Sequence, residues 1–328
     1  IVYANLVGGQ DGVVFDGGSF IVDADGRLLF QAPAFTEGLY VFDLSDPRPV
    51  APEESDELDQ MQSALVLGIR DYVSKNGFAS VLVGLSGGID SALVATLSVE
   101  ALGPEHVTAV YLPSEFSSDE SREDAQEIAR RLSIELLEIP LSATHQALRD
   151  ALPETPTGLA DENLQPRVRG TLLMALANQR NALVLCPGNK SEIAIGYNTL
   201  YGDTIGALAP IADLYKTDVY RLAESLADRI PRRVIEKPPT AELRPNHRDE
   251  DDLPPYSELD PLLGKIIETN LSRTELIAAG FDPELVDRVL PRYYASEYKR
   301  RQLPPAIKVT PKAFGVGRRM PITNAYRD

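Results

Sequence analysis

The residues that most clearly indicate chemistry lie in one short segment, Ser86-Gly87-Gly88-Ile89-Asp90-Ser91. The apolar run at 81–85 predicts a buried strand before this segment, and the apolar periodicity that begins at Ser91 predicts a helix after it. A glycine-rich turn between a strand and a helix N-terminus can bind an anion, because backbone N–H groups converge there and the helix dipole adds partial positive charge. Gly87 and Gly88 permit the close backbone approach that a phosphate requires.

Asp90 is unexpected in a phosphate-binding turn, because a carboxylate repels a phosphate unless a cation lies between them. We therefore expect Mg²⁺, a hard cation that takes oxygen ligands from carboxylates and phosphates. The turn contains no lysine and so is not a Walker loop. It instead resembles the pyrophosphate loop of the ATP pyrophosphatases, which cleave ATP to AMP and pyrophosphate and adenylate an acid or amide oxygen. The alternative is a glycine-rich turn that binds nothing.

A second group of polar residues follows the apolar run at 181–186. Glu192, within Gly188-Asn189-Lys190-Ser191-Glu192, either complements a helix dipole or supplies a second carboxylate for Mg²⁺ opposite Asp90. The segment 197–203 combines tyrosines with Asn198 and Asp203, which favours a site for a ring and a ribose. Lys216 could pair with a phosphate, although a lysine in such a segment is more often on a helix surface.

Regular alternation of two kinds of segment indicates the elements that position these residues. Apolar, β-branched segments predict strands at 79–85, 107–112, 134–139 and 181–186. Periodic segments predict helices at about 58–74, 91–102, 119–132, 142–150 and 163–179. This order indicates an α/β fold with a parallel sheet and helices on both faces. Ligands bind such sheets beyond the carboxyl ends of the strands, where the segments beginning at Ser86, Pro113 and Pro187 are expected to meet.

Two regions outside the alternating segments have a different composition. Residues 1–45 are rich in β-type residues and turn signals, and residues 40–42 are among the β-type segments. They predict hairpins too few to bury a core alone. Residues 46–57 are rich in proline and acidic residues and predict a linker to a main domain at 58–328. The stretch 231–261 is dense in proline and charge and predicts a loop, with a lid as one interpretation.

The composition restricts the expected partners. A net charge of −17 argues against a general nucleic-acid-binding surface. The one cysteine, Cys186, excludes an internal disulfide and favours a reducing, cytoplasmic compartment; we interpret it as a packing residue. No apolar run approaches the ~20 residues that span a bilayer, so no membrane contact is expected. The three histidines form no cluster with cysteine that is typical of a metal site.

Further segments make the resemblance more specific, and the chain resembles the NAD synthetase family of the glutamine-dependent, two-domain bacterial type. The matching segments cover essentially all of 58–325 and are 86–91, 112–114, 162–169, 188–192, 196–203, 239–246, 253–256, 298–302 and 312–315. Residues 7–19 resemble the late part of the nitrilase-like glutaminase domain that is fused to these synthetases. Residues 1–45 are therefore expected to be a truncated, C-terminal part of that domain.

The resemblance implies a reaction in two steps. ATP and Mg²⁺ adenylate the nicotinate carboxylate of deamido-NAD and release pyrophosphate, and ammonia then attacks the acyl adenylate to give NAD and AMP. It also implies the ATP pyrophosphatase fold and a homodimer formed through the synthetase domain. The glutaminase triad of the family lies upstream of residue 7, so we expect ammonia as the nitrogen donor here and glutamine in a longer parent. Ile1 in place of Met favours a fragment.

The resemblance also assigns residue roles. Asp90, Asp203 and Lys216 are expected to be catalytic, and Asp90 and Glu192 to hold Mg²⁺. ATP is expected to contact Ser86, Gly87, Gly88, Asp90, Ser91, Lys216 and Thr240. Deamido-NAD is expected to contact Asn163, Arg167, Tyr197, Asn198, Thr199, Leu200, Asp203 and Lys312.

Some positions have equally simple structural explanations or depart from the family. By pattern alone, Arg167 and Arg169 are equally well explained as ion-paired helix residues, and Lys312 as a solvated residue. Pro187 stands where the family has an ATP-binding threonine, and proline offers neither a hydroxyl nor an N–H.

Two other functions share part of this pattern. Another amidating ATP pyrophosphatase, such as GMP synthetase or asparagine synthetase, has the same loop but lacks segments 162–169 and 196–203. A nucleotide-binding regulatory module without turnover is the other alternative. The pair Asp90 and Glu192 argues against it, because a sensor needs no metal-assisted release of pyrophosphate.

Overall fold

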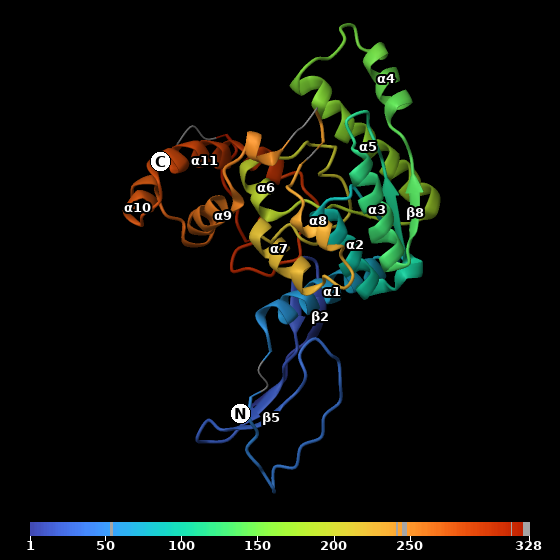
Figure 1. Cartoon of the computed structure of the whole chain (residues 1–328). Coiled ribbons are helices and arrows are strands. Elements are labelled where there is room, and N and C mark those ends of the chain that lie inside the picture. Colours follow the sequence, from blue (N-terminus) through green and yellow to red (C-terminus); the bar gives the residue numbers. More distant parts are fainter. Residues whose placement is uncertain (53–54, 241, 245–247, 316, 324–328) are drawn as a thin grey trace.

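A four-stranded parallel sheet forms the centre of the molecule in the computed structural model, which describes residues 1–52, 55–240, 242–244, 248–315 and 317–323 (Figure 1). The strand order is β8-β7-β6-β9, and every neighbouring pair is parallel. The strands are β6 (Val81–Gly84), β7 (Val107–Tyr111), β8 (Glu135–Glu138) and β9 (Leu183–Leu185). The predicted strands and the α/β fold are confirmed.

Both faces of the sheet are covered by helices. Successive side chains of a strand point to opposite faces, so Val81 and Val83 pack on one side and Leu82 on the other. The first side is covered by α1 (Glu57–Lys75), α2 (Ile89–Leu102), α3 (Asp119–Leu132) and α7 (Lys216–Ser225). The second side is covered mainly by α5 (Leu159–Arg180), which follows α4 (Ser142–Ala151). All the predicted helices are present.

The C-terminal helices surround a separate apolar cluster, which they share with α6 (Lys190–Ile195). They are α9 (Tyr256–Gly264), α10 (Arg273–Ala278), α11 (Pro283–Ala295) and α12 (Glu297–Arg300), with a π-helical turn at Lys265–Thr269. Among the described residues, no helix combines the length and apolar composition that crossing a membrane requires.

The stretch 231–261, predicted as a loop, is partly helical. It contains α8 (Arg232–Glu236), a 3₁₀ turn at Asp249–Asp251 and the start of α9, while another 3₁₀ turn lies at Pro104–His106. The proline-rich composition concealed these short helices, whose buried side chains, among them Val234, Ile235 and Leu259, pack into the two cores. Positions 241, 245 and 246 of the family-like segment, and His247, lie outside the described residues.

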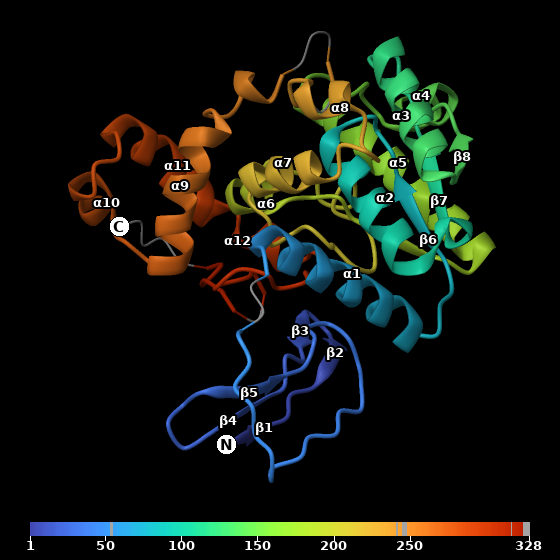
Figure 2. The same cartoon turned by 60° about the horizontal axis from the view of Figure 1, so that its bottom comes forward.

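The N-terminal region forms two small antiparallel units beside α1 (Figure 2). One has the order β1-β4-β5, from β1 (Val2–Tyr3), β4 (Phe20–Val22) and β5 (Leu28–Gln31). The other pairs β2 (Val7–Gln10) with β3 (Val13–Asp16) and contacts α1, where the Gly9 N–H donates to Asp71 at 2.7 Å. Residues 40–42 are irregular, so the expectation of a β-type segment there is wrong: the exposed side chains of Leu39 and Val41 find no packing surface.

Candidate functional site

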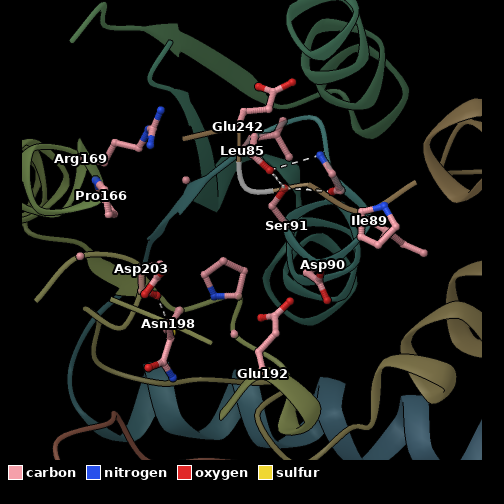
Figure 3. A pocket seen from close by; sticks show the side chains of 18 of the residues that line it. Leu85, Ile89, Asp90, Ser91, Pro166, Arg169, Glu192, Asn198, Asp203 and Glu242 are labelled. Carbon is pink, nitrogen blue, oxygen red and sulfur yellow. Dashed lines mark hydrogen bonds between the residues drawn. The ribbon is translucent and has the colours of Figure 1, made fainter. Parts of the chain in front are cut away.

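A cavity of about 280 Å³ lies beyond the carboxyl ends of β6, β7 and β9. Residues that directly follow these strands, including Leu85, Leu112 and Cys186, form part of its wall. The predicted crevice is therefore confirmed. Figure 3 shows the cavity with side chains from these strand ends, from α2, α5 and α6, and from the segment around residue 242.

The glycine-rich turn is held in shape by its own serines. Ser86 N–H donates to Ser91 Oγ at 3.2 Å, Ser91 Oγ donates to the Gly88 carbonyl at 3.0 Å, and Gly88 N–H donates to Ser86 Oγ at 3.2 Å. Gly87 has a φ of 82°, and a Cβ there would lie 2.4 Å from the Ser121 carbonyl oxygen. No side chain caps α2, because its N-cap residue is Gly88. The start of α2 therefore has the features that an anion site needs, because it lies at the cavity and no side chain caps its first N–H groups.

Three charged side chains gather at this end of the cavity. Figure 3 shows Asp90 and Glu192 close together, and the Lys216 ammonium donates to Asp90 Oδ2 and lies 3.7 Å from Glu192 Oε1. Lys216 is only 1% exposed, so the alternative of a surface lysine is excluded and its position by the carboxylates agrees with the phosphate-pairing role expected for it. It shares a helical face with Val219, which packs into the main core, and that face turns the lysine inward. Burial alone would lower the pKa of Lys216, but the two carboxylates outweigh burial and raise it.

The same two carboxylates fit Mg²⁺. Burial raises the pKa of Glu192, the Lys216 charge opposes this, and Asp90 raises it further. An additional cation between the carboxylates would stabilise their ionised forms. In the part of the chain that the structure describes, no three His, Cys, Asp or Glu side chains are grouped to hold a metal ion. Mg²⁺ at Asp90 and Glu192 would therefore complete its shell with oxygens of a bound phosphate or of water.

The loop 197–203 forms another part of the wall and is tied down from outside the cavity. Lys299 of α12 donates to the carbonyls of Gly196 and Asn198 at 2.7 and 2.6 Å. Asp203 Oδ1 accepts the Thr199 N–H at 2.7 Å. Asp203 is surrounded by protein atoms, although its side chain meets solvent at the cavity. Its burial among these atoms raises its pKa to about 6, and its hydrogen bond with Thr199 and the nearby Lys299 charge oppose this shift.

Asn198 is the unusual member of this loop. Its amide oxygen and nitrogen are both buried, and neither has a hydrogen-bond partner among the residues that the structure describes. Figure 3 places its side chain beside Asp203, on the side of the cavity away from the glycine-rich turn. Buried polar groups are nearly always paired, because leaving one unpaired costs about 1–3 kcal/mol. The unpaired amide therefore favours a ligand at this position.

The predicted site residues fall into two groups. Most line the cavity: Ser86, Gly88, Asp90, Ser91, Glu192, Tyr197, Asn198, Asp203, Lys216 and Thr240. The others are not part of its wall: Gly87, Asn163, Arg167, Thr199, Leu200 and Lys312.

Four residues of the second group join α5 to the loop. Thr199 Oγ1 donates to Asn163 Oδ1 at 2.8 Å, and Arg167 Nε donates to the Leu200 carbonyl at 3.2 Å. Lys312 lies on the C-terminal segment, where its carbonyl accepts a bond from Lys190.

The cavity wall also contains polar residues that the sequence did not single out. Arg169 lines it and donates to the Leu112 carbonyl at 3.0 Å, although its pattern fitted an ion-paired helix residue equally well. Glu242 accepts Ser121 Oγ at 2.6 Å, and Lys237 donates to the same hydroxyl at 2.8 Å. Arg169 could have been suspected from its family-like segment. Glu242 could have been suspected in the same way, from the family-like segment 239–246, whereas Lys237 lies in the stretch predicted as a loop, outside any such segment.

The chain is similar in sequence and structure to known NAD synthetases, and in structure also to the NMN synthetase of Francisella tularensis, which is 28% identical with a TM-score of 0.66 over 74% of this chain and 95% of that one. Residues 61–304 match the family described as NAD synthase. The glutamine-dependent NAD(+) synthetase of Synechocystis sp. is 47% identical over 339 residues, which cover 99% of this chain and 61% of that protein. The chain thus spans about three fifths of the length of the curated relatives it matches.

Two solved structures show the same similarity at different chain lengths. The glutamine-dependent NAD+ synthetase from Acinetobacter baumannii, in complex with ADP, is 40% identical with a TM-score of 0.69, covering 100% of this chain and 62% of that one. The NH3-dependent NAD synthetase from Campylobacter jejuni is 30% identical with a TM-score of 0.63, covering 74% of this chain and 96% of that one.

Proposed function

The chain belongs to the NAD synthase family, and we propose that it catalyses the ATP-dependent amidation of deamido-NAD to NAD. In the proposed reaction, ATP adenylates the nicotinate carboxylate and releases pyrophosphate, and ammonia then displaces AMP. The carrying observation is that one cavity has two differently equipped sides. Asp90, Glu192 and Lys216 lie by an anion-binding turn, and Asn198 and Asp203 lie on the other side.

The first side suits pyrophosphate release. A carboxylate is a poor electrophile, and adenylation supplies a good leaving group, so charge on the departing pyrophosphate must be neutralised. The N–H groups at the start of α2 would bind its oxygens, with the turn held by Ser86 and Ser91. Lys216 would move its ammonium from Asp90 to a phosphate oxygen. Mg²⁺ held by Asp90 and Glu192 would supply further positive charge.

The second side suits the acid and its nitrogen donor. Asn198 offers an amide donor and acceptor that no protein group uses. Asp203, whose pKa lies near 6, would hold an ammonium ion and accept the proton that the nitrogen must lose before it attacks. A cavity of about 280 Å³ is small for a dinucleotide and ATP together. We therefore propose that the dinucleotide extends past the cavity toward Asn163 and Arg167 on α5, and toward Lys312.

Ammonia is the proposed direct nitrogen donor. One structural relative whose length this chain nearly fills is an NH3-dependent NAD synthetase. Cys186, the cysteine of this chain, is buried, and burial raises the pKa of its thiol to about 12, so it does not serve as a thiolate nucleophile. This supports its interpretation as a packing residue. A homodimer through the synthetase domain, action in the cytoplasm and a glutaminase origin for residues 1–45 remain proposals from family resemblance.

The test is to incubate the chain with ATP, Mg²⁺ and deamido-NAD, with ammonium or glutamine in parallel, and to measure NAD and AMP. We expect stoichiometric NAD and AMP with ammonium. Three other acids are tested in place of deamido-NAD: nicotinate mononucleotide, xanthosine monophosphate and aspartate. If the site is specific, each should give at least ~10²-fold less AMP than deamido-NAD does. AMP formed mainly with xanthosine monophosphate or aspartate would replace the proposal with another amidation. ATP binding without AMP from any acid would favour the regulatory module.

A further inference from the structure

We propose that Lys190 and Asp213 form a buried clamp that positions the C-terminal segment 309–315, and with it Lys312, for the dinucleotide. The proposal goes beyond the reaction itself and relies on it only for the role of Lys312. Lys190 and Asp213 touch neither the cavity nor its reacting side, so both are positioning residues.

The clamp binds the segment mostly through its backbone. Asp213 Oδ2 accepts the N–H groups of Val309 and Thr310, each at 2.8 Å. Lys190 Nζ donates to the Lys312 carbonyl at 2.9 Å and to Thr310 Oγ1 at 2.6 Å. Thr310 Oγ1 in turn donates to the Asp213 carboxylate at 2.9 Å. Backbone contacts at Val309, Thr310 and Lys312 itself fix where the Lys312 side chain begins.

The clamp is fully buried. Lys190 and Asp213 are both 0% exposed, and their charged groups are 2.9 Å apart. The Lys190 ammonium donates to Thr310 and to the Lys312 carbonyl, and it lies 3.9 Å from Glu268 Oε1 and 4.6 Å from the centre of the Tyr215 ring. A buried ion pair adds little net stability, because desolvation cancels most of its attraction, and in some proteins such a pair serves to select one arrangement of the segments around it. The pair therefore fits a role in positioning better than a role in stability.

The same short segments that hold this clamp also carry the charges of the cavity. Lys190 is two residues before Glu192 on α6, and Asp213 is three residues before Lys216. Asn189, next to Lys190, donates to Asp90 Oδ1 at 3.0 Å. The clamp therefore connects the C-terminal segment to the side of the cavity that binds phosphate in the proposed reaction.

A second contact holds the other end of the segment. The Phe314 ring packs 6.5 Å from the Tyr293 ring, centre to centre, and the Arg300 guanidinium lies 5.0 Å from the centre of Phe314. Lys312 thus lies between two fixed points, the clamp on one side and Phe314 on the other. Releasing the clamp should free the Lys312 backbone without unfolding the C-terminal helices.

The test uses Thr310→Val, which removes the hydroxyl between the two charges and keeps its volume, with Thr310→Ser as the variant that retains the hydroxyl. Thr269→Val is the matched control, since Thr269 Oγ1 only donates to the Lys265 carbonyl at an exposed turn. Hydrogen exchange at residues 309–315 should become about tenfold faster in Thr310→Val, because two hydrogen bonds are lost. In Thr310→Ser the exchange rate should return to that of the unaltered chain. The KM for deamido-NAD should rise about tenfold while the KM for ATP stays within about twofold, since only dinucleotide contacts are displaced.

A double variant, Lys190→Met with Asp213→Leu, removes both charges together and so leaves no unpaired buried charge. It should fold, and should show faster exchange at 309–315 than Thr310→Val. Unchanged exchange in both variants would overturn the clamp, and this holds even if the chain makes no NAD. Faster exchange with an unchanged KM for deamido-NAD, in a chain that makes NAD, would overturn the positioning of Lys312 and leave the proposed reaction intact.

Discussion

The two sides of the cavity differ in how their polar groups are satisfied. At the glycine-rich turn, the charges already pair with one another, since Lys216 bonds Asp90 and lies 3.7 Å from Glu192. At the loop 197–203, the Asn198 amide is buried without any partner, although the loop around it is tied by Lys299.

The difference suggests two ways of preparing a site. A paired cluster is stable without ligand and must rearrange to accept a phosphate, so binding there exchanges one set of ionic contacts for another. An unpaired buried amide in a fixed loop raises the free energy of the unliganded protein, because the amide has lost its hydrogen bonds to water. A ligand that hydrogen-bonds the amide removes this penalty on binding. We therefore expect substitutions on the first side to change catalysis and stability together, and those on the second side to change binding with little loss of stability.

Asp90→Asn should have the largest effect. The variant keeps the size of the side chain and a partner for Asn189, but it loses the charge that faces Lys216 and the proposed Mg²⁺. We expect turnover to fall by at least ~10²-fold, measured as AMP formed with deamido-NAD and ammonium. Near-normal turnover in a folded Asp90→Asn protein would show that Asp90 is not part of the metal site. It would also contradict the expectation that substitutions on the first side of the cavity change catalysis.

Lys216→Met tests the pairing directly. It leaves the carboxylates of Asp90 and Glu192 facing each other without the buried cation, which should destabilise the fold by about 3 kcal/mol. Added Mg²⁺ should restore more stability to this variant than to the unaltered chain, because the metal can take the place of the ammonium. Urea unfolding with and without Mg²⁺ measures both effects. Ca²⁺ serves as the comparison cation. If Mg²⁺ stabilises Lys216→Met and the unaltered chain equally, no metal binds between these carboxylates.

Asn198→Leu tests the unpaired amide. The substitution keeps the approximate shape and removes two polar atoms that no protein group satisfies. We expect stability to stay within about 1 kcal/mol or to rise, while the KM for deamido-NAD rises about tenfold. Thermal unfolding and steady-state kinetics measure the two quantities. A large loss of stability would show that the amide has a structural partner in solution and would contradict the division proposed for the cavity.

The smallest effect is a pH dependence at Asp203. Its pKa in the folded protein is about 6, above its ordinary value of 3.8, so between these values the folded chain holds a proton that the unfolded chain releases. Its contribution to stability is therefore greatest below pH 3.8, decreases as the pH rises to about 6, and is constant above that. Asp203→Asn has no such change.

The measurement is the difference in unfolding free energy between Asp203→Asn and the unaltered chain, taken from pH 4.5 to 7.5 in a series of buffers. The advantage of the variant should grow up to about pH 6 and then level off. The shared titrating groups cancel in this difference. A flat difference over the whole range would mean that water in the cavity keeps Asp203 at its ordinary pKa.

Elements with strong local patterns could be predicted from the sequence. The apolar strand before Ser86 and the periodicity after it required a strand, a turn and a helix, and Gly87 adopts the positive φ that such a turn demands. The site was predictable to the same extent, since residues that directly follow buried parallel strands meet at one edge of the sheet. Ser86, Leu112 and Cys186 reach the cavity for this reason, and Asp90 and Glu192 lie at the start of the helices that follow β6 and β9.

Residues without such a local pattern could not be placed in advance. Glu242 and Lys237 converge on Ser121 from a proline-rich stretch whose path depends on what it packs against. The pattern around Lys216 did not show that it is buried, because one lysine at a helix start gives no indication of which side faces the core; only the family resemblance assigned it to the site. Residues 40–42 have the composition of a strand, but the rings of Tyr40 and Phe42 pack on Phe30 of β5 without pairing of the two backbones as strands.

The sequence by itself determined the parallel sheet, the anion-binding turn and the identity of the groups that can do chemistry. These follow from hydrophobic periodicity and from the geometry of a strand that leads into a helix, both of which act over a few residues. Only the tertiary structure decided which charges pair, which amide is left unpaired, and that Lys190 and Asp213 hold the C-terminal segment across more than ninety residues of chain. Such contacts depend on burial and on the meeting of distant segments, and neither is encoded in local spacing.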